Sequence, residues 1–332
     1  MKAYEIQKFG MDGLTLVNRP MPEPGSNQVL VRMHAWALNY RDWMTATGRY
    51  NPRLKLPQIP LSDGAGEVVA VGSAVEDFKP GDRVASTFFE RWVSGTPTDE
   101  QAKTALGAGR DGVLAEYVAL HQDGVIKIPE HLSYAEAATL PCAGLTAWNA
   151  LTGNFRTGDT ILTLGTGGVS IFATQFARLS GARVIVTSSS NEKLEKAKAL
   201  GAHETINYKE IPEWGKHVRQ ITAGRGADLV IELGGPGTFN KSVTAVRRGG
   251  TIALIGALAP GSDVNIVPVL MNAIRVQGIF VGSREMFSAM NTAISLHRLH
   301  PVIDRTFRFD EAREAFKLME SGGHFGKICI AM

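Results

Sequence analysis

The chain of 332 residues has few cysteines, little net charge and no long hydrophobic run. Two cysteines, Cys142 and Cys329, are too few for a disulfide framework, and their scarcity is typical of a reducing compartment. A structural zinc site needs about four clustered Cys and His ligands, and the sequence contains no such cluster. No stretch approaches the ~18 apolar residues of a membrane span, and residues 1–9 lack the apolar core of a signal peptide. We therefore expect a cytoplasmic protein with no metal and no membrane partner.

The charge is balanced, with 35 Lys and Arg against 32 Asp and Glu. Arg247 and Arg248 form the only tight basic pair, so we expect no nucleic-acid partner. The hydrophobic share of 44% is that of a globular protein. The length exceeds one ordinary core and favours two domains.

The strongest motif is a glycine-rich turn after an apolar strand over residues 160–164. A helix over residues 170–179 and a second strand over residues 184–187 complete a βαβ unit. In such a unit Gly165 permits the tight turn, and Gly167 lets backbone N–H groups approach a pyrophosphate at the helix N-terminus. Ser170 stands where the usual pattern has a third glycine, and a serine is small enough to be tolerated there. The alternative is a plain βαβ turn without a ligand.

The first third of the chain predicts short strands separated by Gly and Pro, which favours a β-rich barrel-like or sandwich-like domain. Residues 96–112 are polar and irregular, typical of an exposed loop. Ser133 and Glu136 form a capping box that opens a helix over residues 135–140, which Pro141 ends.

Strands and helices then alternate, which predicts a doubly wound parallel sheet. The expected strands are residues 161–164, 184–187, 229–233, 251–255 and 276–281, and the expected helices are residues 146–151, 170–179, 191–200 and 239–246. A helix over residues 310–321 and a strand over residues 326–331 return to the first domain. The predicted domains are residues 1–122, 123–283 and 284–332, in an α/β fold.

Along nearly its full length the chain resembles the medium-chain dehydrogenase/reductase superfamily, in its zinc-independent, quinone-oxidoreductase-like (zeta-crystallin-like) branch. Single motifs of this kind are common, but their order along the chain is specific. They comprise residues 20–31, 38–42, 62–66, 79–84 and 140–147, the turn at Gly165, Gly249 with Gly250, and Gly326 with Lys327. The resemblance implies a GroES-like β-rich catalytic domain, a Rossmann domain and a cleft between them.

The positions that hold catalytic zinc in metal-dependent relatives carry other residues here. Asn39 replaces the first cysteine, and Ser62 with Asp63 replaces a His-Glu pair, so only Cys142 is retained. One thiolate and a carboxylate do not supply the three protein ligands of a catalytic zinc. We interpret Cys142 as a packing residue and expect no metal. Without a Lewis acid, reduction of an activated acceptor is favoured over oxidation of an alcohol.

The end of the second Rossmann strand indicates the cofactor. No carboxylate stands at about Ser188, where NAD enzymes place one for the ribose 2′-hydroxyl. Ser188, Ser189 and Lys193 offer hydroxyls and a charge to a 2′-phosphate, which favours NADPH. The alternative is that this serine run only caps the next helix. Glu192 is evidence against NADPH, because its carboxylate is free to face the ribose.

The resemblance implies further cofactor contacts. The glycine turn and the family pattern together give this set of expected cofactor-binding residues: Thr146, Gly165, Thr166, Gly167, Gly168, Val169, Ser188, Ser189, Lys193, Tyr208, Gly234, Gly256, Leu258, Val281, Gly282 and Ser283.

Catalysis of hydride addition to a carbonyl needs a donor at the carbonyl oxygen and a proton source. By resemblance Asn39 and Tyr40 face the cleft, and Tyr50 matches a proton donor proposed for enoyl-reducing relatives. Alternatively, Tyr50 is a loop aromatic that packs on Pro52, and water supplies the proton.

These observations favour an NADPH-dependent reductase of a quinone or an α,β-unsaturated carbonyl. The alternatives are an alcohol or aldehyde dehydrogenase of the same superfamily and a catalytically weak NADPH-binding protein. Expected substrate loops at residues 50–57, 88–92 and 286–290 are rich in aromatic and sulfur side chains, which favours an apolar acceptor. The apolar strands over residues 251–255 and 273–281 predict a sheet-edge homodimer.

Overall fold

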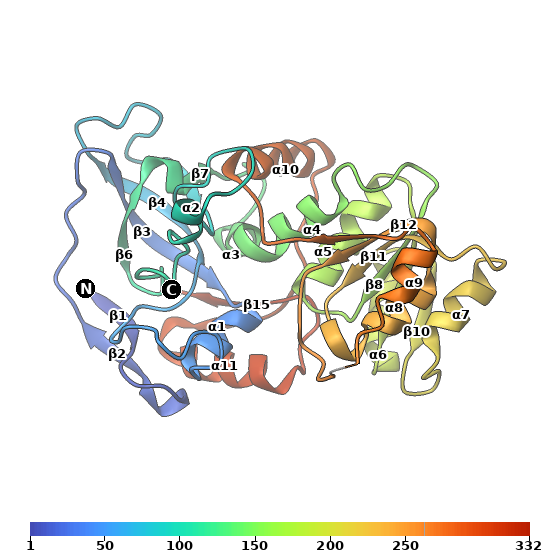
Figure 1. Cartoon of the computed structure of the whole chain (residues 1–332). Helices are drawn as coiled ribbons and strands as arrows, with labels where there is room; N and C mark the ends of the chain where they lie inside the picture. The colour runs from blue at the N-terminus through green and yellow to red at the C-terminus, as the bar shows by residue number, and fades with distance from the viewer. Residues whose placement is uncertain (262) are drawn as a thin grey trace. The chain divides into compact units, whose positions relative to one another are not determined.

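The computed structural model describes residues 1–261 and 263–332, which form two compact units (Figure 1). Unit 1 consists of residues 1–145 and 281–332, and unit 2 of residues 146–280. The predicted domain boundary after residue 122 differs from the structure, which joins residues 123–145 to unit 1. The reason is that β7 (Val125–Lys127) pairs with β5 (Arg83–Ser86), and α3 (Tyr134–Ala138) packs on the strands of the same unit.

Unit 1 is built on a seven-stranded, largely antiparallel sheet. In spatial order the strands are β14 (Ile303–Arg308), β15 (Lys327–Ala331), β3 (Gln28–Ala37), β4 (Asp63–Val71), β5 and β7, with β6 (Tyr117–His121) also paired to β3. A separate two-stranded sheet joins β1 (Lys2–Ile6) to β2 (Leu14–Asn18). The unit also contains α1 (Tyr40–Ala46), α2 (Asp99–Ala102), α10 (Arg284–His297) and α11 (Ala312–Ser321). Its core joins both ends of the chain, because Trp36, Phe316 and Ile328 are buried in one cluster.

Unit 2 contains a six-stranded parallel sheet in the order β10-β9-β8-β11-β12-β13. The strands are β8 (Thr160–Leu164), β9 (Arg183–Ser188), β10 (Glu204–Asn207), β11 (Ala227–Glu232), β12 (Val246–Leu254) and β13 (Arg275–Gly278). The helices are α4 (Leu145–Leu151), α5 (Gly168–Leu179), α6 (Asn191–Ala199), α7 (Trp214–Ile221), α8 (Phe239–Ala245) and α9 (Val267–Met271). This order is that of a dinucleotide-binding sheet, whose direction of winding reverses between β8 and β11. The predicted α/β class and parallel sheet are confirmed.

Two local predictions differ in outcome. The capping box is confirmed: the Ser133 hydroxyl accepts a hydrogen bond from the Glu136 N–H at 3.3 Å, and the Glu136 carboxylate accepts one from the Ser133 N–H at 2.8 Å. The predicted loop at residues 286–290 is wrong, because these residues belong to α10. That helix was visible in the spacing of its buried Phe287, Met290 and Ile294, which recur at helical intervals.

Candidate active and dinucleotide sites

The glycine turn of unit 2 leaves open space at the start of α5. Gly165 has a φ of 80°, a left-handed conformation that glycine adopts without steric cost. A Cβ added to Gly167, the N-cap of α5, meets no heavy atom within 4 Å. Protein atoms therefore leave space beside the N-terminus of this 12-residue helix, as a bound phosphate requires.

Ser170 stands at the position of the third glycine of the motif, and its hydroxyl is hydrogen-bonded there. The side chain is 1% exposed, and its Oγ donates a hydrogen bond to the Leu164 carbonyl at 2.7 Å. This bond ties the first turn of α5 to the end of β8. The serine is therefore accommodated because its buried hydroxyl has an acceptor.

A cavity of about 440 Å³ lies at the carboxyl ends of the unit 2 strands, where the winding reverses. Ligands of doubly wound sheets bind at this point. Four of the expected cofactor residues line the cavity, namely Gly165, Tyr208, Gly234 and Leu258. The other lining residues are Leu164, Thr187, Trp214, Leu233, Gly237, Thr238, Lys241 and Ala259.

Lys241 and Trp214 are lining residues that sequence reasoning missed. Lys241 lies on α8 and Trp214 begins α7, and these two helices contact each other. No local motif marks either residue, because only helix packing brings them to the cavity. Lys241 supplies an ammonium group to a cavity whose other lining residues are aliphatic, aromatic, hydroxyl-bearing or glycine.

The serine run after β9 does cap the next helix. The Ser190 hydroxyl accepts a hydrogen bond from the Lys193 N–H at 3.4 Å, and the Ser188 hydroxyl accepts one from the Ser190 N–H at 3.3 Å. Glu192 forms an ion pair with Lys196 at 2.8 Å along the exposed face of α6. Its carboxylate is thus engaged within the helix.

The other expected cofactor residues do not line this cavity, and several have structural roles. Val281, Gly282 and Ser283 belong to unit 1, where the Ser283 hydroxyl accepts a hydrogen bond from the Met286 N–H and begins α10. A Cβ on Gly256 would lie 2.4 Å from the Leu233 carbonyl oxygen, so backbone packing requires this glycine. The remaining expected residues outside the lining are Thr146, Thr166, Gly167, Gly168, Val169, Ser188, Ser189 and Lys193.

Glu232 is a second feature of the dinucleotide site that the sequence did not reveal. Its side chain ends β11 and is fully buried. One carboxylate oxygen accepts hydrogen bonds from the Gly234 N–H at 2.8 Å, the Gly235 N–H at 3.0 Å and the Thr238 hydroxyl. The other accepts one from the Ser242 hydroxyl. Glu232 therefore holds the glycine turn that forms one wall of the cavity.

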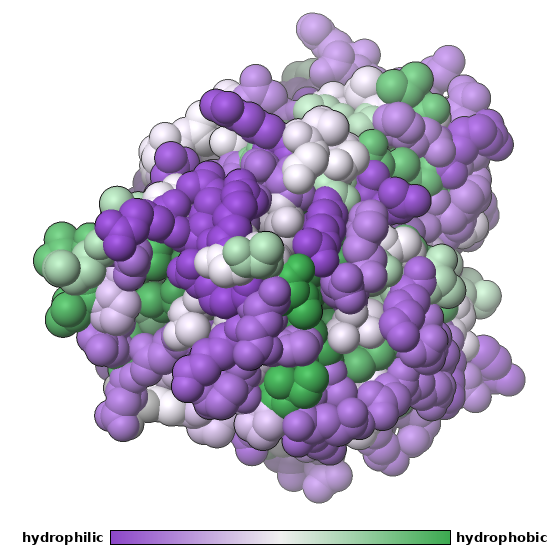
Figure 2. All heavy atoms as spheres, turned by 90° about the vertical axis from the view of Figure 1, so that its right-hand side faces the viewer, coloured by the Kyte–Doolittle hydropathy of each residue, from purple (hydrophilic) through white to green (hydrophobic). Residues whose placement is uncertain are grey.

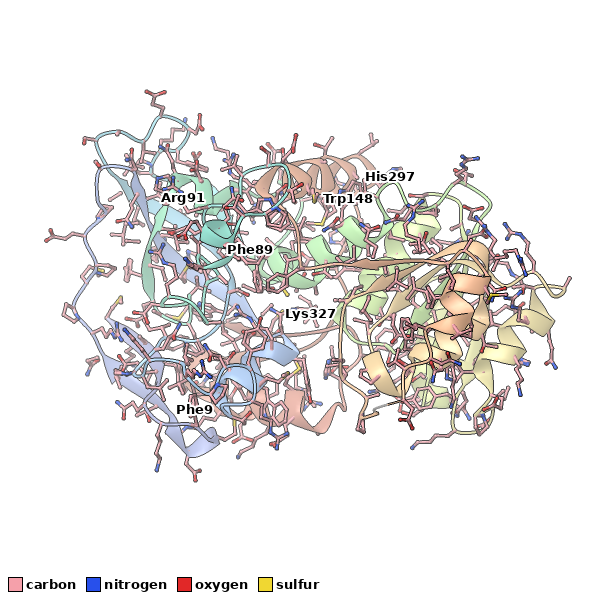
Figure 3. All side chains as sticks on the ribbon, in the orientation of Figure 1. Phe9, Phe89, Arg91, Trp148, His297 and Lys327 are labelled. Carbon is pink, nitrogen blue, oxygen red and sulfur yellow. The ribbon has the colours of Figure 1, made fainter. Side chains whose placement is uncertain are left out.

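Unit 1 contains a polar cluster of four buried residues, Asn39, Asp42, Asp63 and Lys327, with the half-buried Cys142; it is called the Asn39 cluster below. Lys327, which is labelled in Figure 3, is 2% exposed at the start of β15. It donates hydrogen bonds at 2.7 Å to the Leu38 carbonyl and to Asn39 Oδ1. Asp63 Oδ2 lies 3.7 Å from the Lys327 ammonium and accepts a hydrogen bond from the Cys142 N–H at 3.2 Å. Residues far apart in sequence thus meet at one point.

Two groups of the Asn39 cluster have strongly raised pKa values. Burial raises the pKa of Asp42 to about 6; Arg41 opposes the shift, and Asp63 adds to it. The Asp42 carboxylate also accepts a hydrogen bond from the Asn39 N–H at 2.8 Å, which fixes the start of α1. Burial and the nearby Asp63 raise the pKa of the Cys142 thiol, so the thiol stays protonated at neutral pH.

The two expected catalytic tyrosines differ in position. Tyr50 is 38% exposed, and its pKa is raised, mainly by the burial of part of the side chain; Arg41 lowers it, and Cys142 and Asp42 raise it. The ring of Tyr40 instead packs against Trp43, with 5.2 Å between ring centroids.

The donor set of the Asn39 cluster does not fit a zinc ion. Among the described residues, no three His, Cys, Asp or Glu side chains are grouped so as to hold a metal. The Lys327 ammonium already lies beside the oxygens of Asn39 and Asp63, where a zinc ion would meet a like charge. An amide, a carboxylate and a single cysteine do not replace the ligands of a catalytic zinc.

The chain combines two features of a dehydrogenase/reductase. One is a dinucleotide-type sheet with an open phosphate turn, and the other is an antiparallel β unit with a polar cluster. The family described as an alcohol dehydrogenase GroES-like domain matches residues 25–130, and a zinc-binding dehydrogenase family matches residues 168–295. The chain belongs to the medium-chain dehydrogenase/reductase superfamily of nicotinamide-dependent oxidoreductases, as its ordered motifs predicted.

Relatives within the superfamily have different described activities. A zinc-type alcohol dehydrogenase-like protein of Schizosaccharomyces pombe is 43% identical over 97% of this chain and 96% of its own length. A chloroplastic quinone oxidoreductase of Triphysaria versicolor is 32% identical over 99% of this chain and 98% of its own length. A crystal structure described as an NAD-dependent alcohol dehydrogenase is 35% identical, covers both chains fully and has a TM-score of 0.92.

Proposed function

We propose that this oxidoreductase is a zinc-independent, NADPH-dependent reductase of a quinone or an α,β-unsaturated carbonyl. The observation that carries the proposal is the Asn39 side chain. It is 9% exposed, and its Nδ2 has no hydrogen-bond partner among the described residues. A buried donor without a partner is costly, so its presence in an active site suits an acceptor atom brought by a ligand.

Asn39 and Tyr50 take the two roles that the reaction requires. The Asn39 amide donates a hydrogen bond to the substrate carbonyl oxygen, where negative charge develops. The phenol of Tyr50 is protonated at neutral pH, as a tyrosine with an ordinary or a raised pKa is, so it holds the proton that the substrate carbon or oxygen receives. NADPH supplies the hydride when bound. This division of roles explains why no Lewis acid is needed.

Residues of unit 2 would hold NADPH. The pyrophosphate fits the open turn between Gly165 and α5, and the adenosine fits the cavity that Tyr208 lines. No carboxylate ends β9, where it would repel a 2′-phosphate. Ser188, Ser189 and Lys193, with Lys241 added from the cavity lining, supply the donors for that phosphate.

The first test is cofactor oxidation by chelator-treated protein. NADPH and NADH are compared against a panel of quinones and enones, and zinc content is measured in parallel. Turnover that prefers NADPH and survives the chelator supports the proposal. Activity confined to alcohols or aldehydes and lost with the chelator contradicts it.

Tyr50 is tested separately. In Tyr50→Phe we expect a lower kcat with little change in NADPH affinity, because the phenyl ring keeps its packing and only the proton donor is lost. Tyr117→Phe in β6 is the matched control and should keep full activity. An unchanged kcat in Tyr50→Phe would assign the proton to water.

An alcohol or aldehyde dehydrogenase is the second candidate, favoured by the names of two relatives above. This activity requires zinc bound by an unexpected ligand set or an activated substrate. Stoichiometric zinc in the purified protein would favour this candidate. A catalytically weak NADPH-binding protein would instead bind NADPH tightly and turn over no acceptor in the panel.

A homodimer formed through β13 is proposed on the basis of exposed hydrophobic side chains. β13 is an edge strand, and Val276 on it is 39% exposed. Leu270 on α9 is 79% exposed, and the face in Figure 2 carries hydrophobic groups within a mostly hydrophilic surface. Unpaired edges of this kind favour association. Val276→Lys should yield a monomer by light scattering, whereas Leu296→Glu on α10, 77% exposed, should not.

A cytoplasmic location is proposed because both cysteines are free thiols. In the described part of the chain, no helix combines the length and apolar character needed to cross a bilayer. Cell fractionation tests this location.

A further inference from the structure

The environment of Lys327 fixes the orientation of a neighbouring amide. An ammonium group only donates hydrogen bonds, so the Asn39 atom that faces Lys327 at 2.7 Å must be Oδ1. The second bond of Lys327, to the Leu38 carbonyl at 2.7 Å, holds the ammonium in place. The orientation of this amide therefore follows from chemistry and leaves Nδ2 as the group without a partner.

The carboxylate of Asp63 balances the buried charge of Lys327 but does not displace the hydrogen bond from Lys327 to Asn39. Its Oδ2 is 3.7 Å from the ammonium, which is longer than a hydrogen bond, and its Oδ1 accepts a bond from the Ser62 hydroxyl at 2.6 Å. The two hydrogen bonds that Lys327 donates therefore both end on neutral oxygens, the Leu38 carbonyl and Asn39 Oδ1.

We propose that Lys327 is a positioning residue that orients and polarises the Asn39 amide, so that Nδ2 donates to the substrate carbonyl oxygen. A cation bonded to an amide oxygen draws electron density from the nitrogen and strengthens the N–H donor. The Lys327 cation thereby stabilises the reacting carbonyl indirectly, through the polarised Asn39 amide, and without a metal. The inference rests on the proposed reductase function for its catalytic part only.

The experiment compares three variants by steady-state kinetics and cofactor binding. Lys327→Met should lower kcat about 10- to 100-fold while the NADPH Kd changes less than about 3-fold. Lys327→Arg keeps a donor cation and should recover part of that loss. Lys127→Met is the matched control, because Lys127 is an exposed lysine of the same unit that pairs with Asp82, and it should keep full activity.

Asn39→Asp keeps the test valid if Lys327→Met fails to fold. A carboxylate at residue 39 pairs with Lys327 and preserves folding, but it has no N–H donor, so kcat should fall at least as far as in Lys327→Met. An active Asn39→Asp variant would overturn the inference. So would a Lys327→Met variant whose NADPH affinity falls in proportion to kcat/KM, because Lys327 would then act on the cofactor.

A spectroscopic measurement separates this inference from the proposed function. The side-chain amide signal of Asn39 in ¹H–¹⁵N spectra of the cofactor-free protein is assigned by its absence in Asn39→Asp. It should shift in Lys327→Met and not in Lys127→Met. If wild-type protein reduces no quinone or enone, the proposed function fails, but the shift still tests the orientation. An unchanged signal in folded Lys327→Met overturns the inference.

Discussion

The two candidate sites are built from different parts of the polypeptide. In unit 2 the space for the phosphates is bounded by backbone: a left-handed Gly165, an N-cap glycine with open space beside it, and the first turn of α5. In unit 1 the Asn39 cluster is made of buried side chains whose charges and hydrogen bonds determine each other. The first site is therefore sensitive to backbone conformation and the second to charge.

The difference predicts how each site fails. A backbone site loses its ligand when a turn is strained, even though the surrounding core is intact. A cluster of buried charges loses orientation and stability together, because each removed partner leaves another group unpaired. Five variants test this contrast.

Gly165→Val should have the largest effect. Valine at a φ of 80° is strained, and its side chain enters the phosphate space, so we expect the NADPH Kd to rise at least about 100-fold, or about 3 kcal/mol. Gly158→Val is the matched control, because Gly158 has a φ of 88° and equally open space. Calorimetry should show a similar loss of stability in both variants and lost binding only in Gly165→Val. Equal affinities would contradict a backbone-defined site.

Asp42 should make the stability of unit 1 depend on pH. Its pKa is about 6 in the folded protein against 3.8 for the free side chain, so the folded state binds more protons between these values. The free energy of unfolding then falls as pH rises through this window, by up to about 3 kcal/mol from this group.

Asp42→Asn removes the titrating group and keeps an acceptor for the Asn39 N–H. As pH rises from 4 to 7, the wild type should therefore lose up to about 3 kcal/mol of unfolding free energy relative to Asp42→Asn. Chemical denaturation at several pH values measures it. A constant difference would mean that the carboxylate is not buried as described.

Glu232→Gln should destabilise unit 2 by about 1–3 kcal/mol, because an amide cannot accept all four hydrogen bonds that the carboxylate accepts. Denaturant unfolding measures the loss, and NADPH affinity should fall because the Gly234 turn loosens. Glu213→Gln, in an exposed pair with Lys216, is the control and should change little. A loss of the same size in the control would argue against a special role for Glu232.

Lys193→Met and Lys241→Met should have the smallest effects. Each removes one cation from the expected 2′-phosphate site, so NADPH affinity should fall about 10-fold while NADH affinity stays nearly constant. Lys216→Met serves as the surface control. Equal losses of affinity for NADPH and NADH would mean that the lysine contacts a part that both cofactors share, and not the 2′-phosphate.

The sequence predicted the features that depend on local pattern. The βαβ unit, the capping box at Ser133 and the parallel sheet follow from strand periodicity, glycine spacing and cap residues, which act over a few residues. The position of Asn39 came from a family resemblance, and its N-cap position agrees with the local sequence.

The remaining features depend on contacts between distant segments. Lys327 reaches Asn39 only because β15 pairs with β3, and Lys241 reaches the cavity only because α7 contacts α8. Glu232 is different, because its four donors, from Gly234 to Ser242, lie close to it in the sequence. No known cap or turn pattern marked this carboxylate at the end of an apolar strand. The loop expected at residues 286–290 failed for another reason, because the helical spacing of its apolar residues was overlooked.

The pairing of β15 with β3 also determines the order in which the two units can be completed during synthesis. Residues 146–280 form unit 2 and leave the ribosome before Lys327 is made. Until then, Ala35 to Ala37 of β3 lack the partner strand that Cys329 to Ala331 provide, and Asn39 lacks its cation. Because domains fold as units during synthesis, the nucleotide-binding unit can fold while the other still has an open strand edge. The nascent chain is therefore most exposed to aggregation at that edge, in the interval before its last strand emerges.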